Sequence, residues 1–353
     1  MAFIKLEEIL KKAVEMGASD IHLGYSQPPL YRVNGHLASL PEDLLLGKEE
    51  VQSLAREIIP HKGIMESFQK QGEVDFAYSI PGIARFRVNL FKQRNSWALA
   101  IRIIPFKIPE WDELGLPPIV RELAMQEKGL VLISGSSGSG KSTTLAAIID
   151  LLNQSRKFHI LTLEDPIEYL HNNHNCIVNQ REIGADSKTF PQALRAALRQ
   201  DPDVIMLGEM RDLETISTTI TAAETGHLVL ASLHSGTAIQ TLERIIDIFP
   251  PHQQTQLRLQ LANCLQGVIN QQLLSRADAK GRILAVEIMI ATPAVRNLIR
   301  ENKIHQIYSS MQTGSSYGMV TMEKAMQELW HQRLISDEEA SKQGLVWGKS
   351  QTY

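Results

Sequence analysis

The stretch that decides the fold is Gly135-Ser136-Ser137-Gly138-Ser139-Gly140-Lys141-Ser142. It follows an apolar run, Leu130 to Ile133, that predicts a buried strand, and it opens a helix predicted over Ser142 to Leu152. A strand, a glycine-rich loop, a Lys-Ser pair and a helix in this order form a P-loop. Glycines let backbone N–H groups surround a phosphate, and the helix N-terminus adds partial positive charge. The alternative, a chance Gly/Ser surface loop, is disfavoured because both flanks fit.

Each residue of this loop has an expected role. Lys141 is expected to reach the outer phosphates of ATP, and the Ser142 hydroxyl to bind Mg²⁺. The predicted nucleotide-binding residues are Gly135, Ser136, Ser137, Gly138, Ser139, Gly140, Lys141, Ser142, Thr143 and, further along the chain, His227.

Length and composition narrow the class of protein. The chain has 353 residues, which favours two domains or more. Its net charge of −3 includes no basic run, so nucleic acid is not an expected partner. The two cysteines, Cys176 and Cys264, lie far apart, which indicates a reducing compartment and argues against structural zinc. No apolar run reaches the ~20 residues of a membrane span, and the amphipathic N-terminus lacks a signal-peptide pattern. We expect a cytoplasmic protein.

Residues 1–104 predict a small α+β domain. Asn34-Gly35 is a strong hairpin signal between two short strands. A polar helical stretch follows over Lys48 to Gln71. Alternating apolar residues on both sides of Pro81-Gly82, and a further strand at Trp97 to Ile104, predict an antiparallel sheet with helices packed on it.

Four prolines then punctuate the chain, and residues 105–117 are interpreted as an interdomain linker. Residues 118–290 predict a mostly parallel sheet with helices. The predicted strands are Leu130–Ile133, His159–Leu163, Val204–Leu207 and Leu228–Ala231. The P-loop, Glu164, Glu209 and His234 follow these four strands in turn. Because ligands bind beyond the carboxyl ends of parallel strands, these groups are expected to converge at one edge.

The chain beyond residue 238 predicts further helices. Two apolar stripes, from Ile239 to Ile246 and from Leu257 to Ile269, have helical spacing. Ile283–Met289 is interpreted as a short strand. Residues 291–353 are interpreted as a C-terminal helical region with helices over Ala294–Arg300 and Met322–Leu334.

Two carboxylates are candidates for chemistry. Glu209 ends a buried strand of Walker B form and is expected to hold Mg²⁺ directly or through water. Glu164, in Glu164-Asp165-Pro166-Ile167-Glu168, is expected to polarise the attacking water. The alternative for the second motif is a turn with solvated acids.

Two histidines flank the Leu228–Ala231 strand. A neutral imidazole at His227 or His234 is a candidate for contact with the γ-phosphate, and His234 is also a candidate catalytic residue. A structural role is the alternative for each. A metal site is disfavoured, because no Cys or Asp stands at ligand spacing.

Arginines form two groups. Arg85 and Arg87 lie on one face of a predicted strand, and Arg102 lies on the next. A solvated basic face is the plain interpretation of each; the sharper one is a catalytic arginine finger for a neighbouring subunit's nucleotide. Arg195 and Arg199 share a helix face and are expected to line an interface or pair with acids.

Taken together, these motifs resemble the type IV pilus retraction ATPases, the PilT-like branch of the type II/IV secretion ATPase superfamily. The resemblance covers nearly the whole chain. The stretches that carry it are the P-loop, Ala18–Leu23, Arg85–Asn89, Glu164–Glu168, Gly208–Asp212, Thr225–His234 and Ala294–Glu301. The departures are Ser136-Ser137 in place of the usual Pro-Thr, and Ser235 in place of Thr; both keep the loops small and polar.

The resemblance implies a PAS-like N-terminal domain, a RecA-like ATPase domain and a homohexameric ring. It implies ATP and Mg²⁺ as substrate and cofactor, with Glu164 as base and Glu209 on the Mg²⁺ side. It also implies a peripheral location at the cytoplasmic face of the inner membrane, with a platform protein and the pilus assembly machinery as partners. The absence of a four-cysteine module favours the retraction branch.

Several alternatives stay open. The chain could be an accessory retraction ATPase, a type II secretion-type motor, or a nucleotide-binding ring subunit that hydrolyses nothing. A nucleic-acid motor is disfavoured by the missing basic stripe. The sequence does not decide whether the output is motility, DNA uptake or secretion.

The segment Ala294–Glu301 carries a separate expectation. Val295, Leu298 and Ile299 form one apolar helical stripe, and Arg296 and Asn297 lie largely off it. A short packing helix is the plain interpretation. The resemblance favours a surface that couples the ring to the pilus machinery, so replacing Arg296 and Asn297 by Ala is expected to spare the core.

Overall fold

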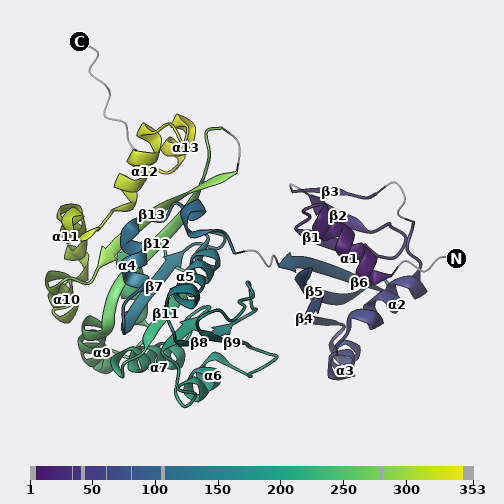
Figure 1. Ribbon diagram of the computed structural model, residues 1–353, viewed down its shortest axis with the longest axis horizontal. Coiled ribbons are helices and arrows are strands. Elements are labelled where there is room, and N and C mark those ends of the chain that lie inside the picture. The colour runs from purple at the N-terminus through teal and green to yellow at the C-terminus, as the bar shows by residue number, and fades with distance from the viewer. Residues whose placement is uncertain are drawn as a thin grey trace, which may run out of the picture. The chain divides into compact units, whose positions relative to one another are not determined.

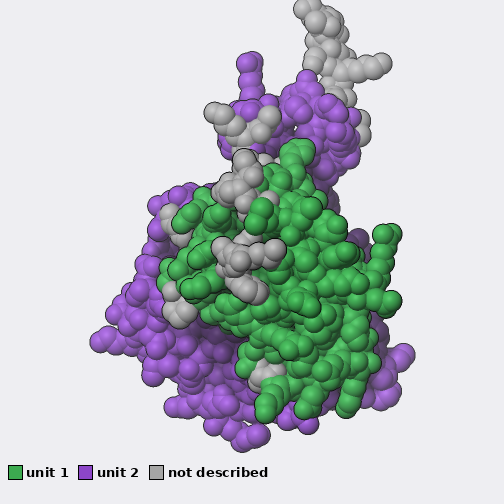
Figure 2. Space-filling model, turned by 90° about the vertical axis from the view of Figure 1, so that its right-hand side faces the viewer, with its two compact units in different colours: residues 1–107 green, residues 108–353 purple. Residues whose placement is uncertain are grey.

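The computed structural model describes residues 5–33, 35–40, 44–60, 62–80, 82–104, 108–278 and 281–344. The chain forms two compact units, Met1–Lys107 and Ile108–Tyr353 (Figures 1 and 2). The predicted turn residues Asn34 and Pro81, and Pro105 of the predicted linker, lie outside the described residues. No helix within the described ranges is long and apolar enough to cross a membrane.

The first unit is a six-stranded antiparallel sheet with helices, as the sequence predicts. The strands lie in the order β3-β2-β1-β6-β5-β4. Their bounds are β1 Asp20–Gly24, β2 Leu30–Val33, β3 His36–Ala38, β4 Glu73–Ile80, β5 Ala84–Gln93 and β6 Ser96–Ile104. Strands β2 and β3 pair Val33 with His36, which confirms the hairpin.

Three helices complete this unit, α1 (Leu6–Glu15), α2 (Lys48–Ile58) and α3 (Lys62–Gln71). Four apolar side chains on one face of α1 are buried in the core shared with the sheet, and Val14 packs against that core partly buried. The single helical stretch predicted for residues 48–71 is two helices, because Pro60 cannot continue a helix.

The second unit is built on a seven-stranded sheet in the order β13-β12-β7-β11-β10-β8-β9. The strands are β7 Gly129–Gly135, β8 His159–Glu164, β9 Ile177–Glu182, β10 Val204–Leu207, β11 Leu228–Leu233, β12 Leu265–Ser275 and β13 Arg282–Ile290. All neighbours pair in parallel except β12 and β13, which are antiparallel. The mostly parallel α/β sheet and its four predicted strands are therefore confirmed.

Helices cover both faces of this sheet. Along β7, Leu130 and Leu132 join one core cluster and Val131 and Ile133 join another, as the two-residue period of a strand requires. The helices are α4 Pro118–Ala124, α5 Lys141–Ser155, α6 Phe190–Ala197, α7 Leu213–Glu224, α8 Ala238–Asp247, α9 Pro251–Cys264, α10 Pro293–Arg300, α11 Ile307–Thr313, α12 Met322–His331 and α13 Asp337–Lys342. The last four form the C-terminal helical part that the sequence predicts (Figure 1).

A second predicted helix needs correction, and one strand was missed. The apolar stripe Leu257–Ile269 is not one helix: α9 ends at Cys264 and β12 begins at once with Leu265. Leu265, Val268 and Ile269 fit a helical spacing, but they lie in a strand whose backbone pairs with β7. Strand β9 was not predicted, because the polar sequence of this edge strand lacks an apolar run.

Candidate nucleotide site

The P-loop joins the end of β7 to the start of α5. Gly135, Gly138 and Gly140 have φ of 147°, 75° and 93°, a region that favours glycine. A Cβ on Gly135 would lie 2.4 Å from both the Gln271 carbonyl oxygen of β12 and Ser139 Oγ. A Cβ on Gly138 would meet nothing within 4 Å. The loop is therefore closed on the side of β12 and open at its tip.

Lys141 is the first residue of α5 and is 8% exposed. Its Nζ donates hydrogen bonds of 2.9 Å to the carbonyl oxygens of Gly135 and Ser136. Burial lowers the pKa of Lys141, and the nearby Glu209 carboxylate opposes that effect. The ammonium group thus lies over the loop whose amides would bind phosphate.

The hydroxyl of Ser139 is a second feature of the loop. It is buried and has no hydrogen-bond partner within the described ranges. Buried hydroxyls are normally paired, so an unpaired one in a phosphate loop is suited to a ligand oxygen.

His234 connects this lysine to Glu209. Its Nδ1 lies 3.4 Å from Lys141 Nζ, and its Nε2 lies 3.5 Å from Glu209 Oε1. Arg211 contacts the other oxygen of the same carboxylate at 2.7 Å. The ends of β7, β10 and β11 therefore bring a cation, an imidazole and a carboxylate together, because these strands are parallel neighbours.

Glu164 ends β8, the strand beside β10, and is 6% exposed. Burial raises the pKa of this carboxyl, while hydrogen bonds to it counter the effect. Oε1 accepts from Thr162 Oγ1 at 2.7 Å and from Gln180 Nε2 at 3.1 Å. Oε2 accepts from the backbone N–H of Glu168 at 3.3 Å. The carboxylate is fixed by three donors, as a positioned base would be.

The donor set fits Mg²⁺ bound together with phosphates. Ser142 is exposed in the first turn of α5, and Glu209 follows β10, which β11 separates from the P-loop strand β7. Among the described residues no group of three His, Cys, Asp or Glu side chains could hold a metal ion. Mg²⁺ does not need one, because it usually takes one or two protein ligands with phosphates and water.

His227 does not belong to this arrangement, so the expectation that both histidines reach the nucleotide edge is corrected. It precedes β11, and its carbonyl oxygen accepts from the N–H of Gly129 at the start of β7. Its Nδ1 lies 2.9 Å from the carbonyl oxygen of Ala222 at the end of α7. The six residues of β11 separate it from His234 by roughly 20 Å.

Arg85, Arg87 and Arg102 lie in the first unit. Arg87 and Arg102 are directly opposite in the β5–β6 ladder, and both are exposed. Arg102 Nε donates to Asp20 Oδ1 at 3.0 Å. Burial alone would raise the pKa of Asp20, but hydrogen bonds from Ser19 and Arg102 lower it overall. The predicted basic face therefore exists, with Asp20 partly neutralising it.

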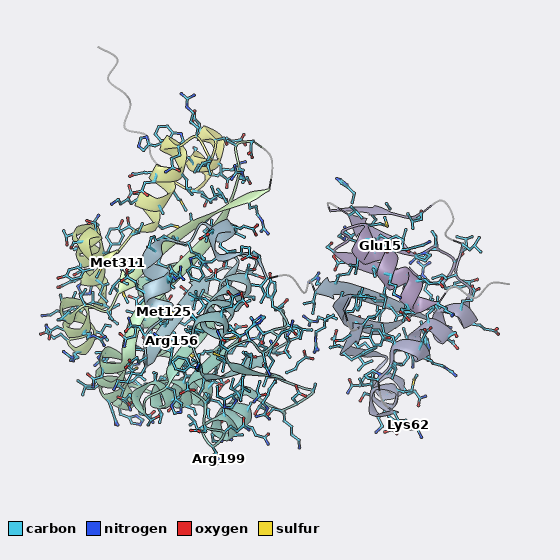
Figure 3. The ribbon with its side chains drawn as sticks, in the orientation of Figure 1. Glu15, Lys62, Met125, Arg156, Arg199 and Met311 are labelled. Carbon is cyan, nitrogen blue, oxygen red and sulfur yellow. The ribbon has the colours of Figure 1, made fainter. Side chains whose placement is uncertain are left out.

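Two further arginine expectations are resolved. Arg195 pairs with Glu214 of α7, and Arg199 lies past the end of α6 and is exposed (Figure 3). Arg296 is not a bare surface residue. Its Nη1 donates to the carbonyl oxygens of Ala262 and Asn263, at 2.5 and 3.0 Å, in the last turn of α9. The expectation that replacing Arg296 spares the core is therefore wrong, because it would expose helix-end carbonyls.

Sequence reasoning missed several residues of the site. Thr162 and Gln180 hold Glu164, and Tyr169 shares a 3.0 Å hydroxyl–hydroxyl hydrogen bond with Thr143. Gln271 on β12 donates to Thr144 Oγ1 at 2.7 Å. Thr162 could have been predicted as a neighbour of Glu164, because it precedes Glu164 by two residues and so shares its face of β8.

A P-loop at the end of a central parallel strand, with carboxylates at two neighbouring strand ends, defines a P-loop nucleotide-binding protein of α/β fold. The family model for "Type II/IV secretion system protein" matches residues 2–342. The chain belongs to that family.

Individual relatives are similar over most of their length. The chain is 45% identical over 343 residues to the type IV pilus retraction ATPase PilT of Pseudomonas aeruginosa, covering 97% of this chain and 98% of the relative. It is 45% identical over 317 residues to the twitching motility protein of Neisseria gonorrhoeae, covering 89% and 83%. A crystal structure of the pilus retraction motor PilT with bound ADP superposes with a TM-score of 0.90 at 48% identity, covering 96% of each chain.

Proposed function

We propose that this chain is a Mg²⁺-dependent ATPase that powers type IV pilus retraction, working as a homohexamer at the cytoplasmic face of the inner membrane. The observation that carries the proposal is the convergence of Lys141, His234 and Glu209 at three strand ends, with Glu164 on the fourth. The near-full-length likeness to retraction ATPases supports the choice of pilus retraction as output. The pilus platform protein is the proposed partner.

The proposed chemistry assigns one task to each group. Lys141 exchanges its two carbonyl acceptors for phosphate oxygens, and the loop amides and Ser139 bind the remaining ones. Glu164 orients the attacking water and accepts its proton. Ser142 and Glu209 are the residues that would hold Mg²⁺, which when bound neutralises charge on the phosphates. His234 contacts the γ-phosphate.

Phosphate release and nucleotide binding by the purified chain test this proposal. We expect release that needs both ATP and Mg²⁺, and a Glu164→Gln variant that binds ATP normally but does not turn it over. A wild-type ring that binds ATP without releasing phosphate would instead identify a structural subunit. Rapid turnover by Glu164→Gln would reassign the base, with Glu209 next in line.

The arginine face of the first unit is proposed to act on a neighbouring subunit's ATP, with residues 105–117 as the hinge. Mixing a subunit that carries Arg87→Ala with one that carries Lys141→Ala should restore some activity, since one kind of interface is then intact. Mixtures that stay inactive at every ratio, while both variants assemble, would refute the assignment in trans.

A clean deletion strain tests the output. Abundant surface pili without motility are expected when retraction is lost. Pili that still retract slowly would favour an accessory retraction ATPase, and a secretion defect with normal pili would favour a secretion motor.

A further inference from the structure

The side-chain amide of Gln180, on the edge strand β9, makes three hydrogen bonds. Oε1 accepts from the backbone N–H of His171 at 2.8 Å. Nε2 donates to the carbonyl oxygen of Tyr169 at 2.8 Å and to Glu164 Oε1 at 3.1 Å. An amide has two N–H donors, so both are used.

These partners fix which way the amide faces. His171 offers a donor and Tyr169 an acceptor, both from backbone groups that cannot exchange roles. Only one orientation of the amide satisfies both, and that orientation aims the second N–H at Glu164. The orientation of the amide is therefore set by the loop that follows Glu164.

We infer that Gln180 is a positioning residue for ATP hydrolysis: its amide holds the Glu164 carboxylate and the loop at Tyr169–His171 in one mutual orientation. The inference rests on the proposed function, in which Glu164 is the base. Because Tyr169 also bonds Thr143 beside Ser142, the same loop links the base to the first turn of α5. Gln180 itself contacts no phosphate in this scheme.

The charge surroundings of Glu164 determine the sign of the expected effect. Glu168 lies on its own loop, Glu182 is its register neighbour on β9 and bonds the N–H of Ile167, and Glu209 follows β10. Burial and the Glu168 charge raise the pKa of Glu164, and the Gln180 hydrogen bond lowers it. Losing that bond therefore raises the pKa, and a base with a higher pKa is protonated over a wider acidic range.

The test is the pH profile of phosphate release by Gln180→Met, which keeps the length of the side chain and removes both donors. We expect kcat to fall about 10-fold near neutral pH with the affinity for ATP unchanged. The acidic limb of the profile should move upward by roughly half a pH unit to one unit. Asn179→Ala, on the opposite face of β9, is the matched control and should leave the limb in place.

Thr162 provides a second variant in case Gln180→Met does not fold. Thr162→Val removes the other donor to Oε1 at constant volume and should shift the limb in the same direction, and Thr162→Ser should restore it. In a Glu164→Gln background, Gln180→Met should have no further effect on residual turnover.

The outcomes separate this inference from the proposed function. A wild-type chain that does not hydrolyse ATP, or a fully active Glu164→Gln variant, overturns the proposed function. Two results would overturn only the positioning role. The first is an inactive Glu164→Gln variant together with an acidic limb that neither Gln180→Met nor Thr162→Val moves. The second is a loss of activity in Gln180→Met that is fully explained by weaker ATP binding.

Discussion

The two edges of the parallel sheet use polar residues in opposite ways. At the carboxyl edge, Lys141, His234 and Glu209 contact one another, and the hydroxyl of Ser139 is buried with no partner within the described ranges. At the amino edge, Arg296 and His227 are engaged by backbone carbonyls. One edge gathers its polar side chains around the P-loop, and the other uses them to complete the ends of helices.

The comparison teaches that residue type alone does not identify a site. In the sequence, His227 and His234 flank the same predicted strand and are both candidates for phosphate contact, yet only His234 lies beside the P-loop. What distinguishes them is the direction of β11, whose carboxyl end reaches the P-loop edge.

The largest expected effect is at the carboxyl edge. Lys141→Ala removes the cation from the phosphate site and should lower ATP turnover by 100-fold or more, on the order expected for losing one transition-state donor. Its thermal unfolding should change little, because burial disfavours the charged ammonium group and so offsets the hydrogen bonds that it donates to the carbonyl oxygens of Gly135 and Ser136. Phosphate release and a melting curve measure both; substantial turnover would contradict the site.

The histidine pair gives the sharpest comparison. His234→Ala should reduce turnover by roughly 10-fold or more, because its imidazole lies between Lys141 and Glu209. His227→Ala should leave the turnover of each isolated active site nearly unchanged. Steady-state kinetics at saturating ATP measure the turnover of both variants. Equal losses of turnover would mean that the two edges of the sheet do not differ in function.

A stability effect is expected at the amino edge. Arg296→Ala leaves two carbonyls in the last turn of α9 without their charged donor, and should lower the free energy of unfolding by roughly 1–3 kcal/mol. Turnover per folded molecule should be preserved. Denaturant unfolding measures the change, and a variant as stable as wild type would show that these hydrogen bonds contribute nothing.

The smallest effect is expected one residue further along. Asn297 is exposed, and its side-chain amide donates to Glu301 just past the end of α10, so Asn297→Ala should change stability by about 0.5 kcal/mol or less. If this face of α10 couples the ring to the pilus machinery, twitching should fall while ring mass and turnover persist. Full motility would assign α10 to packing alone.

Much of the carboxyl edge was predictable from sequence, because its residues follow strands directly. The P-loop, Glu164, Glu209 and His234 each stand at the end of an apolar run, so strand polarity alone brings them together. The sequence did not predict Gln180, since β9 is a polar edge strand and its partner is set by tertiary pairing. Nor did the sequence predict the role of Arg296. This side chain binds carbonyl oxygens at the end of α9, and the apolar spacing had predicted that the helix continues into what is β12.

The position of β7 in the sheet has a consequence for the order of folding. The P-loop strand is encoded at residues 129–135, but its two neighbours, β11 and β12, come from residues 228–233 and 265–275. Such long-range pairing is slow, because distant segments must meet before either is stabilised. In a chain emerging from the ribosome, the P-loop strand β7 therefore keeps backbone groups unpaired along at least one edge until β12 has been synthesised. Truncation before residue 265 should yield aggregating protein rather than a smaller nucleotide-binding domain.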